Sequence, residues 1–222
     1  MKKIELPEYT KGEEIFSAVS HIVGGGFGIL ALLLCTIFSV KRGMDGLSIF
    51  CLVLYGMSII VLYTMSALYH FLRRNRAKKV FRVFDHCTIY FLIAGTYTPI
   101  CGIVLRDNIW GIIILSIVWV GAIIGITFNG INMQWKAVKI ISMILYVVMG
   151  WIIIAAIRPL LDLWSLPGFL WTLGGGIAYT IGVIFYAFGK KCRYIHSIWH
   201  LFVLLGTILQ FVAIFGYIVL AF

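Results

Sequence analysis

Three histidines and an aspartate stand at the ends of long apolar runs in this chain of 222 residues. His70 closes one run, Asp85 opens the next, and His196 and His200 open the last. A charged side chain at the centre of a membrane helix costs about 2.5–3.5 kcal/mol on insertion scales, so ionisable groups in such runs usually mark a functional site. Three imidazoles on facing helices can hold a zinc ion and leave one coordination position for water.

Helical spacing supplies part of the required geometry. Residues four apart lie on one face of a helix, so His196 and His200 point the same way, as do Ser66 and His70. Asp85 could accept a proton from the water or orient a ligand. Ser66, one turn deeper than His70, could hydrogen-bond the carboxylate or a substrate oxygen.

Other interpretations of the same residues remain open. The His196 and His200 pair also suits hydrogen bonding between helices, and Ser66 also suits helix packing. Asp85 could cap the start of its helix, and His70 could be an interfacial residue beside a basic loop. All of these residues lie at the same end of their helices, and this shared position favours a metal site.

Three further side chains are not expected to be metal ligands. His86 follows Asp85 directly and points about 100° away from it, so we interpret it as structural. His21 is expected to pack or hydrogen-bond in the first span. Cys192 lies four residues before His196 and could offer a thiolate, but it falls in a basic loop.

The composition places the chain in the cell membrane. It is 62% hydrophobic and only 12% charged, with a mean hydropathy of +1.06, which excludes an ordinary soluble domain. The five cysteines form no C-x-x-C pair, so no disulfide framework is expected. We expect one seven-helix transmembrane domain over residues 1–222, with a short cytoplasmic tail at 1–15 and no signal peptide.

Seven apolar runs are long enough to cross a bilayer, which takes about 20 residues each. The fold class is therefore all-α, a polytopic bundle of seven transmembrane helices. The predicted spans are 16–40, 47–71, 83–105, 109–129, 137–158, 168–189 and 196–221.

The basic residues predict the orientation. Most of the 18 lysines and arginines fall in the N-terminal tail and in the loops after spans two, four and six. By the positive-inside rule the N-terminus is cytoplasmic and the C-terminus is outside. Because the net charge of +10 is spread over short loops, no nucleic-acid partner is expected. The other side carries only Lys41, Arg42, Arg106 and Arg158.

This orientation brings the candidate residues to one depth. Span two ends, and spans three and seven begin, at the cytoplasmic boundary, so all the candidates lie within about 10 Å of it at a rise of about 1.5 Å per residue. Glycines gather in Gly24-Gly25-Gly26 and Gly174-Gly175-Gly176, where close helix packing explains them better than phosphate binding.

These residues, in this order, resemble the motifs of the hemolysin III family. That family belongs with the progestin and adipoQ receptors (PAQR), which include the adiponectin receptors, and is related to alkaline ceramidases. The resemblance covers the chain from about Glu13 onward, but the long cytoplasmic N-terminal domain of the animal receptors is missing. The motifs are Ser66-x-x-x-His70, Phe84-Asp85-His86 followed by Ala94-Gly95-Thr96-Tyr97-Thr98-Pro99, and His196-x-x-x-His200.

The resemblance implies a bundle that holds zinc through His70, His196 and His200, with Asp85 beside the zinc-bound water and Ser66 as the family's serine. The leading hypothesis is a zinc-dependent hydrolase of a membrane lipid amide or ester, similar to a ceramidase. One alternative is the pore-forming cytolysin that the family name implies. Another is a receptor or membrane-homeostasis regulator that senses lipid and holds zinc only structurally.

The orientation can be tested with reporter fusions. Fusions near Lys78 and Lys191 should report the cytoplasm and a fusion at Phe222 the outside, because basic loops are retained on the inner side. A cytoplasmic C-terminus would mean that a span is miscounted. His70 and His196 could then lie on opposite sides of the bilayer.

Overall fold

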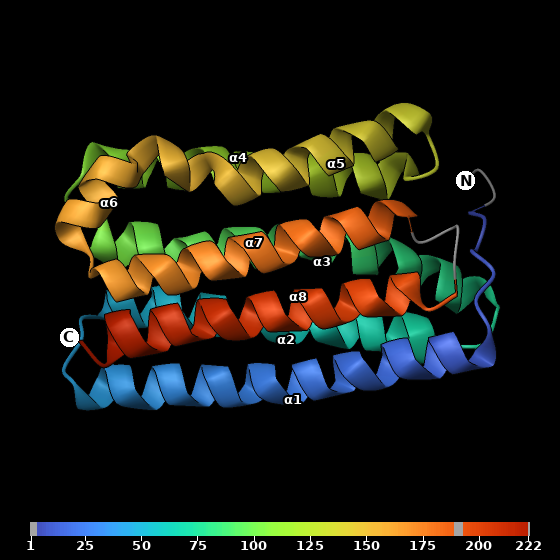
Figure 1. The fold of residues 1–222 in the computed structure, drawn as a ribbon, viewed down its shortest axis with the longest axis horizontal. Coiled ribbons are helices and arrows are strands. Elements are labelled where there is room, and N and C mark those ends of the chain that lie inside the picture. The colour runs from blue at the N-terminus through green and yellow to red at the C-terminus, as the bar shows by residue number, and fades with distance from the viewer. Residues whose placement is uncertain (1–3, 189–192, 222) are drawn as a thin grey trace.

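The computed structural model describes residues 4–188 and 193–221, and these residues form helices joined by short turns, without a strand (Figure 1). Seven helical segments are long and apolar enough to cross a membrane, as predicted. The elements are α1 (Lys11–Lys41), α2 (Gly46–Phe71), α3 (Arg76–Pro99), η1 (Ile100–Val104), α4 (Ile109–Asn132), α5 (Lys136–Trp151), η2 (Ile152–Ala156), α6 (Ile157–Leu163), α7 (Leu166–Phe188), α8 (Ile195–Ile214) and η3 (Phe215–Val219).

Two helices begin earlier than expected. α1 begins at Lys11 because the Thr10 hydroxyl accepts a hydrogen bond from the Glu13 amide, while the Glu13 carboxylate accepts one from the Thr10 amide. α3 begins at Arg76, since the Asn75 side chain accepts a hydrogen bond from the Lys78 amide. The tail therefore ends at Thr10 rather than at residue 15. Most of the basic stretch expected as a loop before span three is helical.

The outer surface of the bundle between its two ends is largely apolar, and several polar groups inside it pair with one another. Ile22, Ile123 and Ile131 are more than half exposed, as suits contact with lipid. Inside, the Thr207 hydroxyl donates to the carbonyl of Val203, so Tyr63 and Tyr179 both donate to Thr207, at 2.8 and 2.9 Å. Such bonds between membrane helices contribute about 0.6–2 kcal/mol each.

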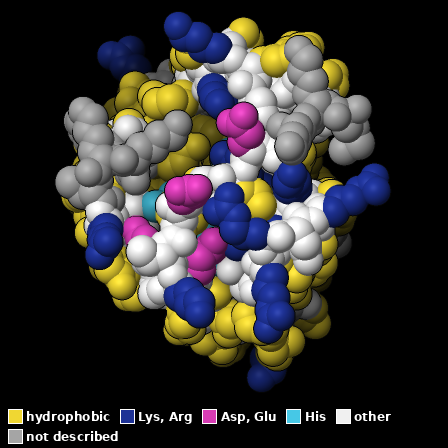
Figure 2. All heavy atoms as spheres, turned by 90° about the vertical axis from the view of Figure 1, so that its right-hand side faces the viewer, with side chains coloured by type: hydrophobic (Ala, Val, Ile, Leu, Met, Phe, Trp, Pro, Cys, Tyr) yellow, Lys and Arg dark blue, Asp and Glu magenta, His cyan; other side chains and the backbone are white. Residues whose placement is uncertain are grey.

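One end of the bundle, here called the histidine end, is where α1, α3, α5 and α8 begin and α2, α4 and α7 end (Figure 1). Figure 2 looks onto this end, where basic side chains surround a few acidic ones. The described lysines and arginines divide between the two ends as the sequence indicated, and the orientation inferred from them stays a prediction. The opposite end carries Lys41, Arg42, Arg106 and Arg158.

A paired carboxylate organises that opposite end. Gly43 takes a left-handed conformation (φ 69°) that ends α1 and reverses the chain. Asp45 then caps α2 and accepts two hydrogen bonds from Arg106, at 2.7 and 2.9 Å. The Arg106 guanidinium holds the pKa of the Asp45 carboxyl well below its usual range. The turn between α1 and α2 is thus tied to the turn before α4.

Glycine allows α1 to approach α2 closely. A Cβ atom at Gly24 would overlap the ring of Tyr63, and one at Gly28 would lie 2.8 Å from Ile59. Gly26, on the same helix, has nothing within 4 Å of the position of a Cβ. The packing expected of the first glycine cluster is confirmed for Gly24 but not for Gly26.

These two glycines provide a matched stability test. Gly24→Ala should lower the free energy of unfolding by about 1–3 kcal/mol, because Tyr63 must move and its bond to Thr207 is strained. Gly26→Ala should have no such cost. Thermal unfolding of the two purified variants in the same detergent measures the difference, and equal melting temperatures would contradict the close-approach interpretation.

Candidate metal centre

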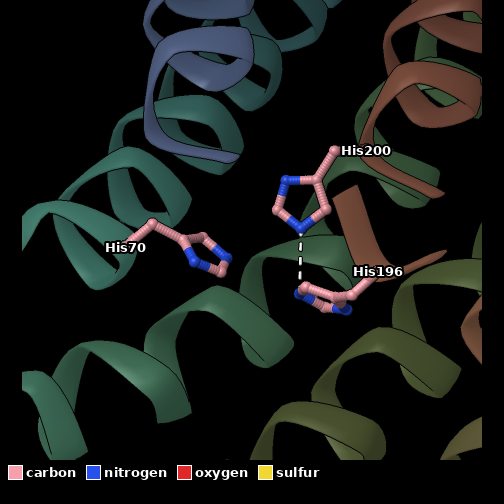
Figure 3. Close-up of side chains that lie close together, drawn as sticks. All are labelled: His70, His196 and His200. Atoms are coloured by element: carbon pink, nitrogen blue, oxygen red, sulfur yellow. Dashed lines mark hydrogen bonds between the residues drawn. The ribbon is translucent and has the colours of Figure 1, made fainter. Parts of the chain in front are cut away.

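Three buried imidazoles converge at the histidine end. His70 lies in the last turn of α2, and His196 and His200 lie in the first two turns of α8 (Figure 3). One ring nitrogen from each lies within 4.8 Å of the other two, and the three residues are 3%, 8% and 0% exposed. The sequence-based expectation that these histidines meet is therefore confirmed.

The nitrogen atoms fit a metal ion. The Nε2 atoms of His196 and His200 are 3.0 Å apart, close to the ~3.3 Å that a tetrahedral ion with bonds of about 2.0–2.1 Å would impose. His70 Nε2 is buried and makes no hydrogen bond among the described residues. Leaving a buried nitrogen unpaired costs about 1–3 kcal/mol. A bound cation would remove that cost, and three imidazoles suit zinc.

A carboxylate that the sequence analysis missed holds the first of these rings. His70 Nδ1 donates a hydrogen bond of 2.8 Å to Glu14, in the first turn of α1. Metal-ligating histidines commonly donate their second nitrogen to a carboxylate in this way. The available signal was the acidic pair at the start of an otherwise apolar run, which we assigned to the tail.

The neighbouring carboxylate holds the helix that carries the other two rings. Glu13 accepts a hydrogen bond of 2.8 Å from the backbone amide of Tyr194, directly before α8. One turn further on, the hydroxyls of Ser17 and Ser197 are 3.1 Å apart. Tyr194 adopts a left-handed conformation (φ 62°), which is unfavourable for a residue with a Cβ. The bond to Glu13 offsets part of that strain.

The segment of residues 4–10 lies against the centre. Tyr9 stacks on the ring of His196, with centroids 4.9 Å apart and planes 14° from parallel. Arg74 fixes the segment by donating to the carbonyls of Pro7 and Leu6. Burial raises the pKa of Tyr9 well above its usual range, so its hydroxyl stays protonated. Figure 2, which looks onto the histidine end, shows only a small patch of histidine between the other described side chains.

Asp85 lies inside α3 and lines the cavity described below. It is 4% exposed, and its Oδ2 is 3.7 Å from Nδ1 of His86. Because α3 begins at Arg76, Asp85 does not cap the helix, and that alternative is wrong. His86 donates through Nδ1 to the carbonyl of Arg82, in line with a structural role.

A cavity of about 140 Å³ opens next to these residues, between α3, α5, α7 and α8. Asp85, His86 and His21 line it on the side of the cluster, and Ile93, Val147 and Val183 are among its apolar lining. The ring of His21 is 4.0 Å from that of His200, and neither of its nitrogens has a hydrogen-bond partner among the described residues. The cavity therefore meets the metal cluster at His21.

The remaining candidates are placed as follows. Ser66 is 1% exposed, one turn from His70, and its hydroxyl has no partner in the described part of the chain. It does not line the cavity. Cys192 lies outside the described residues, and the other four cysteines are free and buried, as expected.

Comparison with known proteins gives concordant results. A family described as haemolysin-III related matches residues 9–211. "Hemolysin-3" of Bacillus cereus is 38% identical over 98% of this chain and 96% of its own length. "Hemolysin-3 homolog" of Bacillus subtilis (strain 168) is 37% identical over 95% of this chain and 97% of its own length. The "Monocyte to macrophage differentiation factor" of Homo sapiens is 25% identical over 74% of this chain and 69% of its own length. The family resemblance inferred from the motifs is thereby confirmed.

The metal centre can be tested by elemental analysis. Purified protein should carry about one zinc ion per chain, and alanine at His70, His196 or His200 should remove most of it, because two imidazoles bind far more weakly than three. His21→Ala and His86→Ala are the controls and should retain the metal. Unchanged zinc content in the double variant His196→Ala, His200→Ala would mean that the two rings serve only to pack the helices.

Proposed function

This chain belongs to the haemolysin-III related family of integral membrane proteins, and we propose that it is a zinc-dependent hydrolase of a membrane lipid amide or ester. The supporting observation is the cluster of three buried histidines beside an apolar cavity within the bundle. A metal centre that adjoins a hydrophobic chamber through His21 suits a substrate with one polar linkage and an apolar chain.

The cavity suits an acyl chain. A cavity of about 150 Å³ in a protein interior holds one benzene molecule, so 140 Å³ accommodates a hydrocarbon segment of about six carbons, such as the part of an acyl chain next to its carbonyl. Most of the lining is apolar, although Thr96, Thr180 and Gln210 also contribute to it, and this favours a hydrocarbon over a sugar or a phosphate. An acyl chain that enters from the bilayer would bring its carbonyl to the polar side of the cavity.

The chain's own residues divide the chemistry between them. His70, His196 and His200 would hold zinc, which when bound acts as a Lewis acid and lowers the pKa of water to about 7. Asp85, at the polar side of the cavity, would take the proton of the attacking water on a carboxylate oxygen. It would then return that proton to the leaving nitrogen or oxygen as the acyl bond breaks.

Ser66 would assist without exchanging protons. Its hydroxyl is buried one turn from His70 and has no partner in the described residues, so it is available to a substrate or to a water molecule. A hydroxyl in this position can donate one hydrogen bond to the oxygen on which charge develops.

Replacement of Asp85 separates a catalytic site from a structural one. Asp85→Asn keeps the shape of the side chain but cannot accept the proton, so turnover of a lipid amide or ester should fall by about 10²–10⁴-fold while zinc is retained. Ser66→Ala should cost less. The assay is release of fatty acid by purified protein in lipid nanodiscs, with zinc content measured on the same samples.

Three outcomes would contradict the hydrolase. Loss of zinc in Asp85→Asn would make the aspartate a fourth ligand of a closed, structural site. No turnover of any lipid amide or ester by zinc-loaded wild-type protein would favour a lipid sensor or regulator. Lysis of red cells that survives removal of the histidines would favour the cytolytic activity implied by the names of the two Bacillus relatives.

A further inference from the structure

We propose that Glu14 and Lys78 form a positioning pair that holds His70 in the tautomer and ring orientation needed to bind the metal. The proposal rests on the metal site proposed above, but not on lipid hydrolysis. Glu14 contacts His70 at Nδ1 rather than at Nε2, and Lys78 contacts Glu14, so each would act on the ion only through His70.

Glu14 selects the tautomer of His70. A neutral imidazole carries its proton on one nitrogen only, and an ionised carboxylate can only accept hydrogen bonds. The 2.8 Å bond between Nδ1 and Glu14 Oε2 therefore places the proton on Nδ1 and leaves the lone pair on Nε2. Nε2 is the nitrogen that lacks a partner in the described residues.

Lys78 holds Glu14 in place. The side chain of Lys78 is only 3% exposed, and a buried ammonium group requires partners. Its Nζ donates to Glu14 Oε1 at 2.8 Å, to the carbonyl of Leu72 at 3.0 Å and to the carbonyl of His70 at 3.3 Å. An ammonium group has three N–H donors, so these three bonds satisfy it completely.

The pair joins three helices around one ligand. Glu14 comes from α1, His70 from α2 and Lys78 from α3. The two carbonyls that Lys78 also contacts, those of His70 and Leu72, lie at the C-terminal end of α2. The positive charge of Lys78 balances the negative charge of Glu14 and also faces the negative end of the α2 dipole. An ion pair with only a packing role would not need to direct one oxygen to His70 Nδ1 and the other to Lys78.

The test measures metal affinity rather than activity. Glu14→Ala should weaken zinc binding by about 10–100-fold, the usual effect of removing such a partner, when zinc is titrated against a competing chelator. Lys78→Met should weaken it less, because the bond from His70 remains. Glu8→Gln is the control: it removes the same charge from an exposed position in the segment that precedes α1 and should leave affinity unchanged.

A double-mutant cycle shows whether the effect passes through His70. In a His70→Ala background, Glu14→Ala should cause no further loss of zinc affinity, since the ring that it positions is gone. Equal zinc affinity of Glu14→Ala and wild type, with a lower melting temperature of the metal-free protein, would make the pair structural and overturn the proposal. Failure of the wild type to bind zinc would overturn the metal site itself.

Discussion

The first turn of α1 holds the two halves of the histidine cluster in register. Glu14 accepts a hydrogen bond from His70 on α2, and Glu13 accepts one from the backbone just before α8, which carries His196 and His200. The ligand nitrogens must meet within a few ångström, whereas helices in a bundle can rotate and slide. Two adjacent carboxylates on a third helix restrict both motions at once.

The low polarity of the bundle makes these few bonds effective. Hydrogen bonds and ion pairs are stronger where water is excluded, and an unpaired polar group there is costly. At the histidine end, the ammonium group of Lys78 has a full set of acceptors. By contrast, Nε2 of His70 and the hydroxyl of Ser66 lack partners among the described residues. The two unpaired groups indicate where a bound ligand would supply the missing partners.

The metal cluster and the cavity have α8 in common but are otherwise built mainly from different elements. The three histidines lie on α2 and α8, while most of the cavity lining comes from α3, α5, α7 and α8. His21 stands where the two meet, since its ring lies against that of His200 and also lines the cavity. Changes in α3, α5 and α7 can therefore alter the shape of the cavity without replacing a residue of the helices that carry the ligands. This arrangement suits a family whose related members carry different names, since function resides in the site rather than in the fold.

The sequence by itself determined the seven spans, since runs of about 20 apolar residues have no stable alternative outside a membrane. It also placed His196 and His200 on one face, because that follows from the helical repeat alone. The starts of two helices were predicted less accurately. Side-chain capping by Thr10 and Asn75 extends α1 and α3 into flanking residues whose charges had indicated a tail and a loop. Only the tertiary structure showed that Glu14 and Lys78 meet His70. In the sequence, Lys78 is one of several basic residues and Glu14 one of two acids, and which of them turns inward depends on the rotation of three helices against one another.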